Sequence, residues 1–191
     1  MCSDQKIDSM NKSKEKTHRV FFALWPTDEV RKQIHHVYEN SSYTSLAKGR
    51  RYKNHNLHLT LHFLGNITEE QLNCVKQQAK TLTASSFNLN INHFGRFKRA
   101  AILWLGAERL PDELKQLQQN LGELLTTCNY KPEAREYRPH ITLMRKFNAE
   151  LKEEGIESIN WQVNQFALIE SIPLESGVMY EPVEFYELNK H

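Results

Sequence analysis

A four-residue phrase that carries acid–base chemistry occurs once in each half of the chain. It reads His-Leu-Thr-Leu from His58 and His-Ile-Thr-Leu from His140. In a β-strand alternate residues share a face, so His58 and Thr60 point one way and the aliphatic residues the other. The same alternation places His140 and Thr142 together. Imidazole titrates near neutral pH, so two of them brought together can serve as general base and general acid. A threonine hydroxyl beside each can donate a hydrogen bond to a phosphoryl oxygen.

A metal site is the alternative use of these histidines. His58 and His62 stand four residues apart, but on a strand this spacing is about 13 Å, too far to share one ion. No acidic residue lies inside either motif. The sequence therefore predicts an acid–base pair that needs no metal and no cofactor. It predicts His62 as a polar residue at the end of the strand, on the same face as His58 and Thr60.

Basic residues flank both motifs, and their charge predicts a rim that attracts phosphate. They are Lys48, Arg50, Arg51 and Lys53 before the first motif, and Arg135, Arg138, Arg145 and Lys146 around the second. Arg145 is the candidate for a direct phosphate contact. Strict alternation puts it on the face opposite His140, so this contact requires the strand to end or bulge near Met144. Tyr52 and Tyr137, in neighbouring polar loops, are the candidates for stacking on a base.

The order of predicted elements gives the motif a place in each half. Each half runs strand, helix, histidine strand and further strand, which indicates a degenerate internal duplication. The expected strands are near residues 20–25, 57–64, 87–91, 101–105, 141–144, 160–170 and 183–188, with helices after Thr27, Thr68 and Pro111 and a long loop at 40–56. Alternating rather than continuous apolar runs favour antiparallel sheets with helices outside. We expect an α+β fold of two pseudo-symmetric lobes, with the active-site cleft between them.

Composition limits the class of protein. The 191 residues are 39% hydrophobic and 25% charged with a formal net charge of +2, typical of a globular chain and not of a non-specific nucleic-acid coat protein. We expect a disordered polar tail at 1–18 and one bilobal domain at 19–191, without a signal peptide or membrane segment. The three cysteines, Cys2, Cys74 and Cys128, lack metal-binding spacing. They predict no disulfide, no structural zinc and a cytoplasmic location, and we expect a monomer.

The paired motifs resemble the two-histidine phosphoesterase superfamily, and within it the bacterial and archaeal RNA 2′,3′-cyclic phosphodiesterases, historically called 2′-5′ RNA ligases. Residues 19–24, 56–65 and 138–145 carry the resemblance, with weaker similarity at 94–97, at 168–171 and around Tyr180. It spans about 19–188 and implies a bilobal α+β fold. It also implies metal-independent hydrolysis of RNA 2′,3′-cyclic phosphate ends to 2′-phosphates.

The same resemblance implies a role for each motif residue. His58 resembles the proton donor to the leaving 3′-oxygen, and His140 resembles the base that activates water. Thr60 and Thr142 resemble the residues that hold the phosphate. The family often has a small residue where Met144 stands.

Other functions are compatible with the same residues. The acid–base pair run in reverse would join RNA ends by 2′-5′ ligation. Another substrate, such as a cyclic phosphate on ADP-ribose or an oligoadenylate, would use the same groups. A non-catalytic RNA- or nucleotide-binding module is disfavoured because both His-Thr pairs are present. In each case the expected partners are RNA ends or cyclic nucleotides.

Overall fold

The computed structural model describes residues 16–46, 49–152, 154–175 and 177–189. The strands are β1 (Thr17–Leu24), β2 (Arg50–Arg51), β3 (Leu59–Thr68), β4 (Phe87–Ile91), β5 (His93–Phe97), β6 (Ile102–Gly106), β7 (Ile141–Arg145), β8 (Ile159–Val163), β9 (Gln165–Leu174) and β10 (Gly177–Glu187). The helices are α1 (Asp28–Glu39), α2 (Tyr43–Leu46), α3 (Glu69–Thr81) and α4 (Asp112–Leu125), with 3-10 turns η1 (Asn54–Asn56) and η2 (Thr126–Cys128). Cys2, Lys48 and residues 1–15 of the predicted tail lie outside the described residues, whereas β1 begins within that tail, at Thr17.

The histidine strands meet at the centre of one sheet. Its eight strands run in the order β10-β9-β1-β3-β7-β6-β5, with β2 paired to β7, and every pairing between them is antiparallel. The strand expected at 160–170 is two strands, and the first of them, β8, pairs with β4 in a separate two-stranded sheet. The predicted α+β fold with mostly antiparallel sheet is confirmed, while the division into two pseudo-symmetric lobes stays a prediction.

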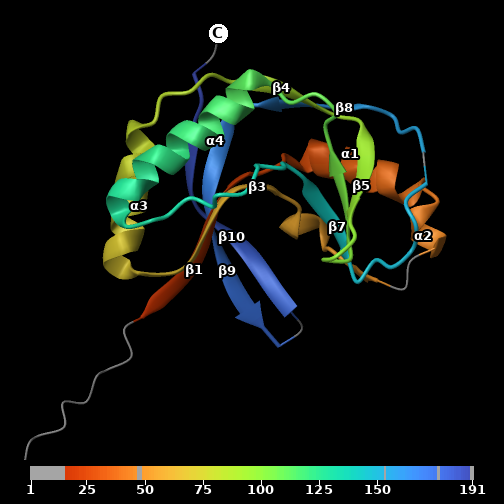
Figure 1. Ribbon diagram of the computed structural model, residues 1–191, viewed down its shortest axis with the longest axis horizontal. Coiled ribbons are helices and arrows are strands. Elements are labelled where there is room, and N and C mark those ends of the chain that lie inside the picture. The colour runs from red at the N-terminus through yellow and green to blue at the C-terminus, as the bar shows by residue number, and fades with distance from the viewer. Residues whose placement is uncertain (1–15, 47–48, 153, 176, 190–191) are drawn as a thin grey trace, which may run out of the picture.

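The helices pack against different strands. Figure 1 shows α3 and α4 side by side against β1, β3 and β10, whereas α1 packs against β8. Thr27 caps α1, and Thr68 forms a capping box with Gln71 at the start of α3, both as predicted. The expected loop at 40–56 instead contains α2, β2 and η1. The last of these segments, η1, is followed by Leu57 and His58, which immediately precede β3.

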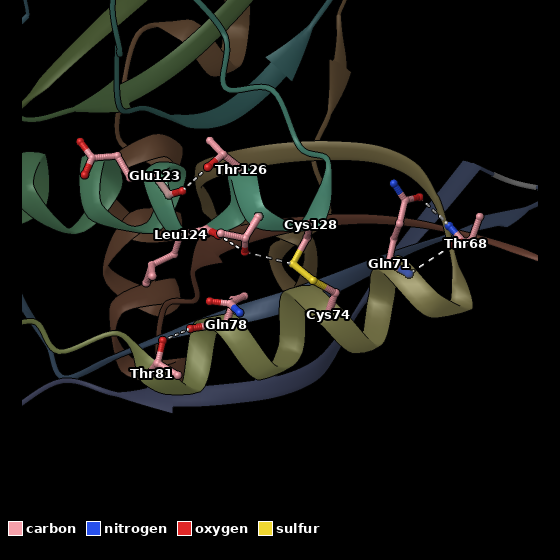
Figure 2. Close-up of a disulfide and its surroundings, with 10 residues drawn as sticks. Thr68, Gln71, Cys74, Gln78, Thr81, Glu123, Leu124, Thr126 and Cys128 are labelled. Carbon is pink, nitrogen blue, oxygen red and sulfur yellow. Dashed lines mark hydrogen bonds between the residues drawn. A yellow bond between two sulfur atoms is a disulfide. The ribbon is translucent and has the colours of Figure 1, made fainter.

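A disulfide joins α3 to η2, so the prediction of no disulfide is wrong. Cys74 and Cys128 are bonded, with their Cα atoms 5.7 Å apart (Figure 2). The sequence places each cysteine on a helical apolar stripe, but only the packing of α3 beside the end of α4 brings them together. The cysteine usage therefore no longer supports a reducing compartment.

Candidate active site

The four predicted polar residues come together where β3 and β7 meet. They are His58, Thr60, His140 and Thr142. The two strands pair through Leu59 and Ile141, whose side chains are buried on the opposite face. Continuing this antiparallel register sets each histidine directly across from the threonine of the other motif. This register makes the two histidines diagonal neighbours, which in antiparallel strands lie roughly 7–8 Å apart.

A β-bulge follows the threonine in both motifs and decides which residues reach this face. In β3 the register with β1 shifts at Leu61, and in β7 the register with β6 shifts at Leu143. Each bulge turns two consecutive residues inward, so His62 and Met144 are buried and only 4% exposed. Arg145, next along β7, therefore returns to the histidine face, which meets the condition that the sequence set for it.

His62 leaves the site for the same reason, so its predicted position on the face of His58 is wrong. It lies within β3 rather than at its end, and it faces α4. Its Nε2 is 2.7 Å from the carbonyl of Gln118, and its Nδ1 is 3.2 Å from the hydroxyl of Tyr130. The carbonyl can only accept, so Nε2 donates and Nδ1 accepts from the phenol. His62 thus links β3 to the middle of α4 and to Tyr130, which follows η2.

Both site histidines are held in the same tautomer by a backbone carbonyl two residues earlier. Nδ1 of His58 is 2.7 Å from the carbonyl of Asn56, and Nδ1 of His140 is 2.8 Å from that of Arg138. Each Nδ1 must donate, which leaves each Nε2 without a proton and able to accept one. Within the described part of the chain, neither Nε2 forms a hydrogen bond. Both histidines therefore have an Nε2 atom that can accept a hydrogen bond or a proton from a ligand.

The surroundings hold both imidazoles in the neutral form. Burial lowers the pKa of His58 to about 4, against the opposing effect of its hydrogen bond to Asn56. The positive charges of Arg31 and Arg145 and the neighbouring His140 lower it further. The pKa of His140 is also lowered, again chiefly by burial. The positive charges of Arg31 and Arg145 that contribute to this lowering would attract a negatively charged ligand.

Aromatic side chains frame each imidazole. The His58 ring lies 4.7 Å from that of Phe21 and 5.0 Å from that of Tyr180, the second in an edge-to-face arrangement. The His140 ring lies 4.8 Å from that of Phe97, also edge-to-face. These contacts limit rotation about the side-chain bonds, so the two Nε2 atoms are pre-positioned.

The remaining predicted site residues differ in their contacts. The hydroxyls of Thr60 and Thr142 form no hydrogen bond within the described residues. Arg145 donates from Nε to the hydroxyl of Tyr52 at 3.2 Å, and its guanidinium lies over the same ring. Tyr137, a stacking candidate, instead donates its hydroxyl to the carbonyl of Thr60 at 3.1 Å and is held against β3.

A sequence profile of the 2′-5′ RNA ligase superfamily matches residues 26–172. The chain belongs to that superfamily. An RNA 2′,3′-cyclic phosphodiesterase of Escherichia coli is 29% identical over 174 residues, covering 90% of this chain and 97% of its own length. A protein of the same name from Thermotoga maritima is 28% identical over 174 residues, covering 85% and 91%.

Solved structures show the same fold. A crystal structure of E. coli LigT complexed with 3′-AMP has a TM-score of 0.80 at 28% identity, and the match covers 91% of this chain and 99% of that one. A crystal structure of a protein described as a phosphoesterase has a TM-score of 0.82 at 28% identity, with the same coverage. This member of the 2′-5′ RNA ligase superfamily therefore shares nearly its whole described length with those structures.

Asn56 is a site residue that the sequence did not reveal. It is 4% exposed, and its side-chain amide donates to the carbonyl of Val178 at 2.9 Å and accepts from the backbone N–H of Tyr180 at 3.0 Å. Its own carbonyl holds His58. Arg31 pins the same segment by donating to two of its carbonyls. An asparagine in a polar loop carries no signal of partners on β10, which lies more than a hundred residues away.

Metal ligands are not gathered at this site. Among the described residues, no three His, Cys, Asp or Glu side chains are placed to hold one ion. The residues near His58 and His140 are threonine, arginine and aromatic rings. This donor set suits a phosphate rather than a cation.

Proposed function

We propose that this member of the 2′-5′ RNA ligase superfamily hydrolyses RNA 2′,3′-cyclic phosphate ends to 2′-phosphates, without a metal, through His58 and His140. The observation that carries the proposal is the pair of carbonyl-tethered imidazoles on adjacent strands, each with a threonine across from it. The relatives named RNA 2′,3′-cyclic phosphodiesterase support the choice of substrate.

The reaction assigns one proton transfer to each imidazole. Nε2 of His140 takes a proton from water as the water oxygen bonds to phosphorus. The bond from phosphorus to the 3′-oxygen breaks, and protonated His58 gives its Nε2 proton to that oxygen, leaving a 2′-phosphate. The hydroxyls of Thr60 and Thr142 donate hydrogen bonds to the non-bridging phosphate oxygens, and the positive charge of Arg145 offsets the negative charge of these oxygens. This assignment of donor and base follows the resemblance of the motifs.

The bound phosphate must raise the pKa of His58 for this ring to act as the proton donor. The pKa of His58 is lowered to about 4 by burial, so the ring is neutral at pH 7. A phosphodiester anion beside it favours the charged ring and raises that pKa. His58 therefore becomes protonated and able to act as an acid when the substrate binds. The pair of histidines takes up one proton in total, so His140, on the other side of the phosphate, stays neutral and can act as the base.

Alanine variants test the mechanism. In EDTA, His58→Ala and His140→Ala each abolish turnover of a 2′,3′-cyclic nucleotide, because each removes one of two obligatory proton transfers. The wild-type rate follows a bell-shaped pH profile. His55→Ala is the matched control, since His55 is exposed in η1 and outside the site. Near-full activity in either site variant would falsify the mechanism.

Reversible 2′-5′ ligation is a second candidate, favoured by a cavity of about 530 Å³ on the His140 side that has room for a second RNA end. Protonation roles reverse, with a 2′,3′-cyclic end and a 5′-hydroxyl end as substrates. Following the products of two such RNA fragments separates joining from hydrolysis. A panel including cyclic phosphates on ADP-ribose and oligoadenylates tests the other substrates, and binding without turnover would support a non-catalytic module.

The state and place of the protein are further proposals. No described helix is long and apolar enough to cross a membrane. We propose a monomer, which light scattering tests, and a cytoplasmic location, which fractionation tests. The Cys74–Cys128 disulfide removes the cysteine argument for that location.

A further inference from the structure

Two grooves lie beside the histidine pair: the first is lined by Asn56, Tyr180 and Arg145, which neighbour His58, and the second by His140 itself. The first, here the arginine groove, has a volume of about 830 Å³ and lies between β2, β1 and the β9–β10 hairpin; its charged lining is Arg19, Arg50, Arg51, Lys53, Arg145 and Glu170. The second, here the His140 groove, has a volume of about 530 Å³; its charged lining is Arg99, Arg135, Arg138, Glu133 and Glu136. Each is large enough for a nucleotide and each contains aromatic side chains, so charge is what distinguishes them.

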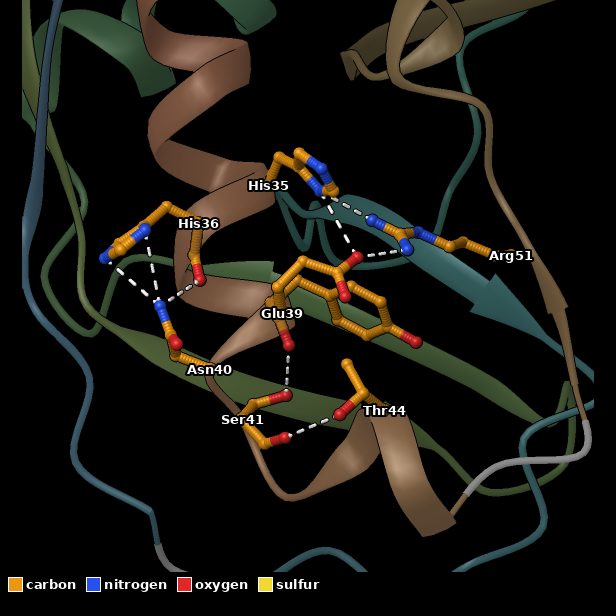
Figure 3. Close-up of polar contacts among 8 residues, drawn as sticks. His35, His36, Glu39, Asn40, Ser41, Thr44 and Arg51 are labelled. Atoms are coloured by element: carbon orange, nitrogen blue, oxygen red, sulfur yellow. Dashed lines mark hydrogen bonds and ion pairs between the residues drawn. The ribbon is translucent and has the colours of Figure 1, made fainter.

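The arginine groove keeps most of its positive charge. Its one acid, Glu170, is bound to Nδ1 of His18 at 2.7 Å. Arg51 forms an ion pair with Glu39, which stands outside the lining (Figure 3). Arg19, Lys53 and Arg145 form no ion pair with any acid in the described part of the chain.

The His140 groove neutralises its own charge. Arg135 pairs with Glu133, and Arg138 pairs with Glu136 at 2.9 Å. These exposed pairs contribute little to stability, but each cancels a charge within the same lining. Arg99 is left as the surplus cation. A polyanion therefore gains far more from the first groove than from the second.

Two tyrosines give the arginine groove a surface for bases. The rings of Tyr52 and Tyr180 lie 6.5 Å apart, and both belong to the lining. Tyr180 also contacts the ring of His58, and Arg145 lies over Tyr52. Cations that track a backbone beside aromatic rings that stack bases are the features of single-stranded RNA binding. These same two contacts connect the groove to His58 and Arg145.

We infer that the arginine groove binds the RNA strand on the 5′ side of the cyclic phosphate, so that the preferred substrate is an oligonucleotide and not a mononucleotide. The inference rests on the proposed function. The terminal phosphate lies between His58 and His140, and the preceding phosphates lie along Arg19, Arg50 and Lys53.

Substrate length tests this inference. The comparison is between a 2′,3′-cyclic mononucleotide and a tetranucleotide with a 2′,3′-cyclic end, with kcat/KM measured over a range of salt. We expect a higher kcat/KM for the tetranucleotide. Its log–log salt slope should be steeper by about 0.7 for each additional phosphate contacted.

Charge reversal locates the strand. Lys53→Glu and Arg19→Glu should each lower the tetranucleotide-to-mononucleotide ratio and reduce the salt slope by about 0.7. Arg99→Glu in the His140 groove is the matched control and should leave the ratio unchanged. Equal kcat/KM for both wild-type substrates overturns the inference, as does a control variant that lowers the ratio as much as Lys53→Glu.

Failure of the proposed function is distinguishable. If the wild type hydrolyses neither substrate, the phosphodiesterase proposal fails and the groove is tested by binding alone. The probe is then a fluorescein-labelled tetranucleotide with a 2′-phosphate end, followed by anisotropy. Weaker binding to Lys53→Glu but not to Arg99→Glu supports the groove, and equal binding to both overturns it.

Discussion

Replacing Asn56 by alanine tests whether the contact between the first motif and β10 positions His58. The change removes two hydrogen bonds, one to the carbonyl of Val178 and one from the N–H of Tyr180. Each neutral bond contributes about 0.5–1.5 kcal/mol net, and an unsatisfied partner adds to the loss. Both partners border the arginine groove, where water can replace the amide. We therefore expect the free energy of unfolding to fall by about 2 kcal/mol.

The same change should slow turnover. The carbonyl of Asn56 fixes the His58 tautomer, and Tyr180 packs edge-on against that ring. Without the amide, β10 and the loop before β3 lose their link, so the imidazole samples orientations that do not reach the phosphate. A loss of about 1.4 kcal/mol in ordering corresponds to about a tenfold lower kcat. KM for a cyclic mononucleotide should change less, because the threonines and Arg145 are untouched.

Thermal unfolding and steady-state kinetics measure the two effects. A loss of about 2 kcal/mol lowers Tm by about 4–8 °C in a chain of this size. Asn54→Ala is the matched control, because Asn54 is exposed and its contacts to Arg31 and to the N–H of Leu57 use only its backbone carbonyl. If Asn56→Ala matches this control in both Tm and kcat, the positioning role of the amide is refuted.

Three further changes have signs that the structure fixes. Gly122→Ala should lower the free energy of unfolding by about 1–3 kcal/mol despite alanine's better helix propensity, because its Cβ would lie 2.8 Å from Cε1 of His62; urea denaturation measures it. Cys74→Ser with Cys128→Ser should cost about 2–4 kcal/mol by opening a cross-link that spans 54 positions, again measured in urea. The pKa of His58 is lowered to about 4, so the free energy of unfolding should fall as the pH drops from about 6.5 to about 4. In this range the imidazole is protonated in the unfolded chain but stays neutral in the folded protein. Comparing the pH dependence of the wild type with that of His58→Gln measures this effect.

Each of these has its own control. Gly155→Ala should be neutral, because no atom lies within 4 Å of the added Cβ. A reductant should destabilise the wild type and leave the double serine variant unchanged. A pH dependence in His58→Gln as steep as that of the wild type between pH 6.5 and 4 would contradict the burial argument.

Local patterns were enough to predict the elements that carry the site. Alternation placed His58 and His140 at strands, and side-chain caps marked the helix starts at Thr27 and Thr68. Each of these sequence patterns lies within a few residues of the strand or helix that it predicts. The antiparallel α+β architecture follows from the same alternation, because a strand with one polar face cannot be buried on both sides.

The missed disulfide and the missed role of Asn56 involve contacts between distant segments, whereas the error at His62 comes from a β-bulge. The disulfide depends on how α3 packs beside η2, and the Asn56 contact depends on β10 returning to the first motif. His62 was misplaced because strict alternation has no means of anticipating a bulge. Two adjacent apolar residues, Leu143 and Met144, mark the bulge in β7, but in β3 the corresponding pair includes His62 and hides the signal.

The two bulges explain why a repeated backbone gives a site with unlike sides. Each shifts the register after the threonine and delivers the residue three positions on to the histidine face. In β7 that residue is Arg145, which lines the arginine groove; in β3 it is Phe63, which is 43% exposed and lines the His140 groove. The two motifs therefore carry similarly tethered imidazoles, while the residue that follows each bulge differs: a cation after the His140 motif and an aromatic ring after the His58 motif. We therefore expect an RNA strand to bind in the arginine groove rather than in the His140 groove, a preference that the two similar histidines alone would not produce.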